Sequence, residues 1–397
     1  MRLPSVCYPL EQVLAVQFPD LRPAQRRGLV LWVYGAVLAK SACEAAVVTA
    51  LCGLGGWHTV RQYLRDWLRD GRDKACPCQT QVAVTACFAP LLRWICALWQ
   101  GRELLLAIDV TTHQDRLTAI VVSVLYRSRA LPVAWQILPG NQPGGFIAPL
   151  LDLLTTLAPA IPAGRRVVVL TDRGLWSPRL YHQLHQQHWH PLMRVQTDVR
   201  VYLGTHRFCA AATLTPQVGH AWVGRAVVHK HRGRRLWLTV VVVWTAGHAE
   251  PWVLFTDLPP RVVGVLWYGV RMWIECGFRD LKAFGWDWEH TRRQDPTRVA
   301  RHWLVLAVAS VWVLSAGTAA EDAGRVASGP PPARTGQRPV SVFQRGLAVL
   351  LTTFLGQCPW PALRLVPERW PMPPPDLQLT YHQPLPRDQW ADQYLPI

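Results

Sequence analysis

Residues 104–112 read LLLAIDVTT and residues 165–172 read RRVVVLTD, so each segment places an aspartate after a run of apolar residues. Short apolar runs of this kind are typical of strands that a sheet buries on both faces. We therefore expect Asp109 and Asp172 each to stand at the end of a buried strand.

The segments around these two runs predict the element order βββαβαβ. Further strands are expected over 117–128, 130–138 and 190–198, and helices over 146–157 and 178–187. Two short connections make the first three strands antiparallel, whereas a helical crossover lets the fourth strand lie parallel beside the first. Both aspartates then emerge at the carboxyl end of the sheet, where α/β sheets commonly place their chemistry.

A polar stripe on one expected helix, residues 263–284, supplies a third acid. At ~3.6 residues per turn, one narrow arc of this helix carries Tyr268, Arg271, Glu275 and Lys282. An exposed salt-bridge network would give the same stripe. Two aspartates at strand ends and one helical glutamate, however, provide three hard oxygen ligands of the kind that Mg²⁺ or Mn²⁺ prefers.

These blocks resemble the DDE transposases of bacterial insertion sequences, in the group marked by a Tyr-(2)-Arg-(3)-Glu-(6)-Lys signature. Residues 268–282, YGVRMWIECGFRDLK, reproduce that spacing. AIDVTT at 107–112 and VVVLTDRGLW at 167–176 look like the first two acidic blocks, and VSVFQRG at 340–346 looks like the C-terminal block. The resemblance spans roughly residues 25–357.

The resemblance implies a ribonuclease H-like catalytic core that cuts and joins DNA by metal-dependent phosphoryl transfer. The implied ligands of two Mg²⁺ ions, for which Mn²⁺ can substitute, are Asp109, Asp172 and Glu275, with Asp109 bridging both ions. Water first cuts at the transposon end, and the freed 3′ hydroxyl then attacks target DNA. The family also implies a homodimer when DNA is bound, because two ends are brought together.

The remaining signature residues are expected to hold DNA. The resemblance implies that Tyr268, Arg271 and Lys282 contact the strand near the transposon terminus, with the arginine binding phosphate in bidentate fashion. A basic hairpin tip within residues 199–258 could clamp phosphates as well, or could simply be a charged turn. Its residues are Lys230, Arg232, Arg234 and Arg235.

The sequence thus predicts an α/β protein: a ribonuclease H-like mixed sheet flanked by helices, with a β-rich insertion and a helical N-terminal domain. The N-terminal domain is expected to bind the DNA end. The expected divisions are 1–101 for that domain, 102–198 for the first part of the core, 199–258 for the insertion, 259–322 for the second part with the glutamate helix, and 323–397 for a loop, a short helix and a Pro-rich tail.

The charge of the chain agrees with a nucleic-acid partner. Forty-two Lys and Arg residues against 25 Asp and Glu residues give a formal net charge of +17, whose usual partner is a polyanion. Arg61, Arg65 and Arg69 recur at every fourth position of an expected helix. That stripe could follow a phosphate backbone or could be a solvated helix face.

The expected location is the bacterial cytoplasm, with association to the nucleoid when DNA is bound. The first residues lack the apolar core of a secretory signal. Residues 303–320 carry no charge and reach the ~18-residue lower limit for a membrane span. Because they lie within a charged chain directly after the signature, we interpret them as a buried helix and expect no membrane partner.

Two alternatives stay open at the level of the sequence. One is a catalytically silent DNA-binding regulator derived from a transposase, and the other is a different ribonuclease H-like nuclease, because a fold does not fix a function. A covalent recombinase with Tyr268 as nucleophile is disfavoured, because no accompanying Arg and His constellation is evident.

Overall fold

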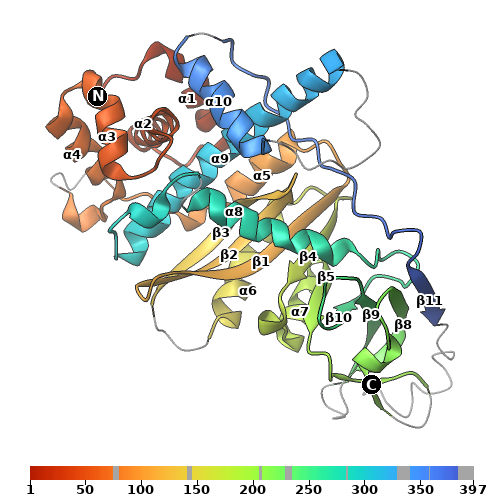
Figure 1. Ribbon diagram of the computed structural model, residues 1–397. Coiled ribbons are helices and arrows are strands. Elements are labelled where there is room, and N and C mark those ends of the chain that lie inside the picture. Colours follow the sequence, from red (N-terminus) through yellow and green to blue (C-terminus); the bar gives the residue numbers. More distant parts are fainter. Residues whose placement is uncertain are drawn as a thin grey trace.

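The computed structural model is an α/β structure built around one large mixed sheet (Figure 1). The residues that it describes are 1–74, 80–140, 145–204, 208–228, 235–282, 285–328, 340–356 and 358–382. Within these residues the sheet has 11 strands in the order β3-β2-β1-β4-β5-β10-β9-β8-β6-β7, and β11 pairs with β8 outside this path.

The strands cluster in the middle of the chain. They are β1 (Glu103–His113), β2 (Leu117–Tyr126), β3 (Arg129–Pro139), β4 (Arg166–Thr171), β5 (His190–Val195), β6 (Arg200–Tyr202), β7 (Cys209–Ala210), β8 (His220–Val228), β9 (Leu236–Trp244), β10 (Trp252–Thr256) and β11 (Gln378–His382).

Helices precede, interrupt and follow the strands. They are α1 (Tyr8–Gln17), α2 (Pro23–Ala39), α3 (Glu44–Leu51), α4 (Trp57–Leu68), α5 (Phe88–Leu98), α6 (Ile147–Leu157), α7 (Pro178–Gln186), α8 (Trp273–Leu281), α9 (Pro296–Ser328) and α10 (Val342–Phe354). Figure 1 shows α1 to α4 at one end of the molecule and strands β8 to β11 at the other.

The predicted order βββαβαβ is confirmed for residues 103–195. Strands β1, β2 and β3 form two antiparallel hairpins, β4 lies parallel to β1, and β5 lies parallel to β4. Every residue of β2 is buried, which requires cover on both faces of the sheet. In Figure 1, α6 and α7 lie on one side of the sheet and α8 and α9 on the other.

The predicted β-rich stretch after β5 extends this same sheet. Strands β8 and β9 form the expected antiparallel hairpin, with Val228 opposite Leu236. Strand β10 then returns between β9 and β5 and pairs antiparallel with both. The insertion is therefore continuous, through backbone hydrogen bonds, with the strands that carry the aspartates.

Three boundary predictions were wrong. β1 does not end at Asp109 but continues to His113, because its pairing with β2 extends that far. The expected helix over 263–284 is instead a 3₁₀ helix, η9 (Trp267–Met272), followed by α8. The loop expected at the start of 323–397 begins as helix, because α9 continues to Ser328 through a stretch with several alanines, which have high helix propensity.

Helix α9 is the central helix of the fold. Its segment Pro296–Gly324 is long and apolar enough to cross a membrane, yet 89% of its most apolar window is buried inside the protein. The prediction that residues 303–320 are buried is therefore confirmed. Trp303 packs against Trp135 of β3 and against Trp288, so this helix is covered by the sheet and by the segment after α8.

Helices α9 and α10 approach each other closely at two glycines. A Cβ atom on Gly346 would lie 1.7 Å from the carbonyl oxygen of Val313, and one on Gly317 would lie 2.0 Å from that of Val342. No real side chain tolerates such distances, so the crossing requires glycine at both positions. This contact docks α10, which the sequence predicted as a short helix, onto the core.

Candidate active site

The two aspartates lie side by side on neighbouring parallel strands. The register of β1 and β4 ends with Ile108 opposite Thr171, so Asp109 and Asp172 are the next residues on each strand. Asp172 then leaves the sheet as the residue before η6 (Arg173–Leu175). The carboxylates consequently share one edge of the sheet, although only Asp172 stands at a strand end.

Helix α8 brings Glu275 to the same place, and its seat on β3 explains why. The helix buries Ile274, Phe278 and Leu281. A Cβ atom on Gly277 would lie 2.7 Å from the Cβ of Ala130, so a glycine allows the close approach of helix and strand. Because this face of α8 packs on β3, the opposite face points to solvent, and Glu275 on that face is exposed.

An ion pair between helix and strand fixes the far end of α8. The Arg129 Nε lies 2.9 Å from Asp280 Oδ2, and both side chains are largely buried. Burial raises the pKa of Asp280 to about 7, while the guanidinium groups of Arg129 and Arg279 act in the opposite direction. Asp280 was not singled out from the sequence, since only its contact with a distant strand distinguishes it from a solvated acid.

One arginine contacts all three acids. Arg271 donates from Nη2 to Asp109 Oδ2 at 2.8 Å and from Nη1 to Glu275 Oε1 at 3.0 Å, and its Nη2 lies 3.8 Å from Asp172 Oδ2. The arginine side chain is only 12% exposed, whereas Asp172 and Glu275 are 43% and 55% exposed. The three predicted acids are therefore brought together around a single guanidinium.

The charges of this cluster are mutually adjusted. Burial raises the pKa of Asp109, partly offset by Arg271 and by the backbone N–H of Val110. Burial alone would lower the pKa of Arg271, but the surrounding carboxylates, Asp109 first, outweigh it and raise that pKa. The arginine accordingly stays charged, and a cation is needed in this place because three acids so close repel one another.

Tyr268 joins the cluster from η9. Its hydroxyl donates to Asp172 Oδ1 at 3.4 Å, and its ring packs edge-on against Trp252. Although the expected continuous helix is absent here, Tyr268 and Arg271 still share a face, because side chains three residues apart eclipse in a 3₁₀ helix. Burial raises the pKa of Tyr268 far above its ordinary value, so the hydroxyl keeps its proton.

Lys282 lies apart from the three acids. At the end of α8, its Nζ donates to the carbonyl oxygen of Thr112 at 3.3 Å and lies 3.6 Å from Glu289 Oε1. The structure thus places Lys282 beside the end of β1 and not within the cluster of acids around Arg271. Glu289 was not anticipated, because nothing in its local pattern indicates a partner at the active-site edge.

A second unanticipated residue, Glu250, braces the loop that follows Asp172. Its Oε1 accepts from Arg173 Nη1 and from Arg194 Nη2, each at 3.0 Å. Glu250 lies between β9 and β10, so it links the insertion to the second acidic block. Next to these residues, a pocket of about 350 Å³ opens beside the acids, lined among others by His248, Trp252 and Met272.

Of the basic hairpin tip, only Arg235 belongs to the described residues. Its guanidinium lies over the ring of Phe208, 5.7 Å from the centroid. Lys230, Arg232 and Arg234 lie outside the described residues. Their predicted contact with DNA stays a prediction.

The donor chemistry of the acid cluster suits a hard divalent cation, since carboxylate oxygens are the ligands that Mg²⁺ prefers. Among the described residues, however, no group of three or more His, Cys, Asp or Glu side chains is arranged to hold a metal ion. Arg271 accounts for this arrangement, because its guanidinium already occupies the space between the carboxylates. The three carboxylates fit a Mg²⁺ ion, and the Arg271 guanidinium would have to move away from them for the ion to bind.

The comparison with protein families decides the family. A family model described as the transposase DDE domain matches residues 104–312, more than half of the chain. The chain belongs to this family. The DDE domain runs from the start of β1 into α9, and it contains Asp109, Asp172, Glu275 and Arg271. Transposases of this kind in general cut and join DNA, and they generally use divalent metal ions.

Comparisons with individual proteins add less. No curated protein matches the chain. Among solved structures, the chain is similar to a piggyBac transposase synaptic complex with hairpin DNA, determined by cryo-EM, at 11% identity and a TM-score of 0.33, over 82% of this chain and 80% of that one. A TM-score this low does not establish a shared fold.

Proposed function

We propose that this DDE-family chain is the transposase of a bacterial insertion sequence, of the group with the Tyr-(2)-Arg-(3)-Glu-(6)-Lys signature, and that its sheet is a ribonuclease H-like core. It would cut DNA at the transposon ends and join the freed ends to target DNA. The observation that carries this proposal is the convergence of Asp109, Asp172 and Glu275 on Arg271.

Asp109, Asp172 and Glu275 would hold two Mg²⁺ or Mn²⁺ ions. When bound, such ions supply an activated oxygen nucleophile and stabilise the leaving oxygen of a phosphoryl transfer. The acids themselves set the affinity, because each must be ionised to act as a ligand. Metal affinity should therefore fall in acid, most of all through Asp109, whose pKa burial raises.

The remaining signature side chains would position DNA. Arg271 would exchange its carboxylate partners for a phosphate, which a guanidinium binds through two parallel N–H donors. Tyr268 keeps its hydroxyl proton and would donate a hydrogen bond to the same DNA strand. Lys282 would act as a point charge near the end of β1, where it now lies beside Glu289.

The wider assignment follows the same proposal. Residues 1–101 would bind the transposon end, and the tip residues Lys230, Arg232, Arg234 and Arg235 would contact DNA from the insertion. Two copies of the chain would act together on DNA, in the bacterial cytoplasm. A membrane partner is not part of this proposal, because the apolar segment of α9 is buried within the protein.

Strand cleavage of a duplex that carries the DNA flanking this gene tests the proposal. With Mg²⁺ or Mn²⁺, the wild-type chain should nick at the ends, and Asp109→Asn, Asp172→Asn and Glu275→Gln should each abolish nicking while binding persists. Asp152→Asn, a change of the same kind on the exposed side of α6, should cut normally. A wild-type chain that binds the ends but never cuts them would favour the silent DNA-binding regulator.

A further inference from the structure

A basic pocket lies outside the acid cluster, between the N-terminal helices and the segment that follows α8. Its volume is about 450 Å³, and it opens between α3, α4 and residues 290–293. The ionisable side chains that line it are those of Glu44, Arg61, Arg65, His290, Arg292 and Arg293. Four arginines thus face one carboxylate, which leaves the pocket strongly positive.

The single acid organises the arginines. Glu44 Oε1 accepts from Arg65 Nε at 2.7 Å and Arg61 Nε at 3.3 Å, and its Oε2 accepts from Arg293 Nη2 at 2.7 Å. Burial alone would raise the pKa of Glu44, but these arginines, Arg293 first, lower it, so the acid stays charged. Each of these bonds uses one of the five N–H donors of a guanidinium. Glu44 thus orients the arginines and leaves them further donors for a ligand.

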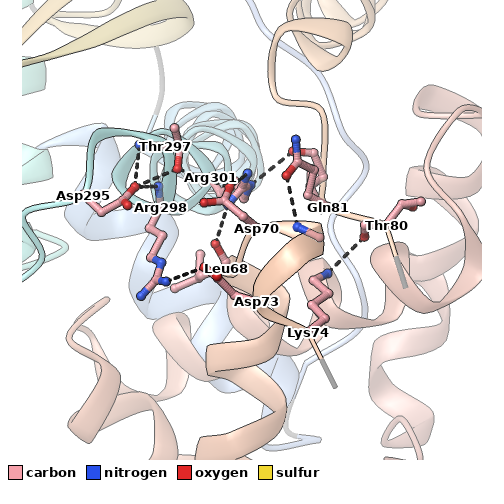
Figure 2. A network of polar contacts seen from close by, with 12 residues as sticks. Leu68, Asp70, Asp73, Lys74, Thr80, Gln81, Asp295, Thr297, Arg298 and Arg301 are labelled. Atoms are coloured by element: carbon pink, nitrogen blue, oxygen red, sulfur yellow. Dashed lines mark hydrogen bonds and ion pairs between the residues drawn. The ribbon is translucent and has the colours of Figure 1, made fainter. Parts of the chain in front are cut away.

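The pocket walls are held in place before any ligand arrives. The guanidinium of Arg61 lies over the ring of Trp57, 5.0 Å from its centroid. Figure 2 shows the network that joins the end of α4 to the start of α9: Arg301 donates to the carbonyl oxygen of Leu68 at 2.7 Å and Arg298 donates to Asp73 at 2.9 Å. The wall formed by α4 is therefore fixed relative to the helix that follows residues 290–293.

A short segment connects the pocket with the acid cluster. Glu289 pairs with Lys282 at the active-site edge, and the next residue, His290, already lines the pocket. The ring of Trp288 packs on His113 at the end of β1, 4.8 Å between centroids. Residues 288–290 thus link the active-site edge to the pocket along the chain.

We propose that this pocket binds backbone phosphates of the duplex whose end lies at the acid cluster. This inference rests on the proposed function and adds a place where the same DNA is held. Guanidinium groups bind phosphate through parallel N–H donors, and an organised group of them gives affinity without reading bases. The sequence left two interpretations for Arg61 and Arg65, a phosphate contact or a solvated helix face. This proposal makes them phosphate contacts.

The salt dependence of DNA binding tests this inference. The double variant Arg61→Gln, Arg292→Gln removes two positive charges from the pocket, and the matched control Arg93→Gln, Arg102→Gln removes two from exposed positions that do not line it. Affinity for a fluorescent duplex with the gene's flanking DNA is measured between 50 and 200 mM salt, without metal. The slope of log K against log salt is negative, and each lost phosphate contact makes it shallower by about 0.9.

For the pocket variant the slope should therefore be shallower by about 1.8. Its affinity should fall about 12-fold less than that of the wild type over this salt range. The single variant Arg292→Gln, which changes an exposed side chain, should make the slope shallower by about 0.9. It keeps the test valid if the protein does not fold without Arg61. An unchanged slope in both variants, or an equal change in the control, overturns the inference. Metal-dependent cleavage by the wild type is scored separately, so failure of the pocket and failure of the proposed function are distinguishable.

Discussion

Replacing Arg271 with alanine removes the cation that three carboxylates now share, and the structure gives the size of the effect. Breaking a buried ion pair costs about 3–5 kcal/mol, because the remaining charge is left without a partner. Asp109 is 18% exposed and meets this condition, whereas the better exposed Asp172 and Glu275 add under ~1 kcal/mol each. We expect a loss of about 3 kcal/mol in unfolding free energy without metal.

That loss converts into a melting temperature. With an unfolding entropy of ~2.1 cal/mol/K per residue, the 397-residue chain should melt about 4 °C lower when Arg271 is replaced. Divalent ions should reverse the loss, because a metal then supplies the missing positive charge. In the wild type the ion has to displace the guanidinium, so the Mg²⁺-induced rise should be smaller than in Arg271→Ala.

Differential scanning calorimetry in EDTA and in Mg²⁺ measures both effects. Arg279→Ala is the matched control, since it removes an exposed arginine from the same helix, α8, without removing a contact of Asp109, Asp172 or Glu275. If Arg271→Ala melts like the wild type in EDTA, or if Mg²⁺ raises both melting temperatures equally, the guanidinium does not neutralise the acids and the reasoning fails.

Three further predictions concern the supports of the site. The pKa of Asp280 lies at about 7 in the fold against an ordinary value of 3.8, so its stabilising contribution is complete below pH 3.8 and is lost as the pH rises through 7. Urea denaturation from pH 4 to 8 should show a loss on the order of 4 kcal/mol that Asp280→Asn abolishes. Gly346→Ala forces a Cβ against the Val313 carbonyl oxygen and should destabilise the protein by about 3 kcal/mol in the same assay. Glu250→Gln releases Arg173 and should slow cleavage on the order of tenfold by loosening the loop after Asp172, with under ~1 kcal/mol of stability lost because Glu250 is well exposed.

Each of these predictions has a defined failure. Gly324→Ala, on α9 with open space around its Cβ, is the control for helix packing and should be neutral or slightly stabilising. A Gly346→Ala variant that behaves like it would refute the close crossing. A pH profile of Asp280→Asn parallel to that of the wild type, or normal cleavage by Glu250→Gln, would remove the role given to that residue.

The sheet around the acids was accessible from the sequence because the information is local. Buried strands read as apolar runs, and the connection lengths decide which neighbours are parallel. The convergence of Asp109, Asp172 and Glu275 followed from these patterns together with the family resemblance, and the structure brings the three side chains together. Their catalytic role is a proposal that the cleavage experiment tests.

The supports of the site were not accessible, because they depend on contacts between distant parts of the chain. Glu250 lies 77 residues from Arg173, and Glu44 lies 249 residues from Arg293. Neither acid has a distinctive local pattern. The 3₁₀ geometry of η9 was also missed, since helical spacing in the signature does not reveal where the helix changes its pitch.

Strand β11 has a consequence for how the protein is made. It pairs parallel with residues His220 to Gly224 of β8, and β6 pairs with the same strand at Val227 and Val228. Strand β8 ends at Val228 and β11 begins only at Gln378. A ribosome therefore releases the edge of β8 long before the strand that covers its first half has been synthesised. During that interval the nascent chain presents an open strand edge, which is a template for pairing with other chains. Synthesis of β11, rather than of the DDE domain, is then the step that covers this part of the β8 edge.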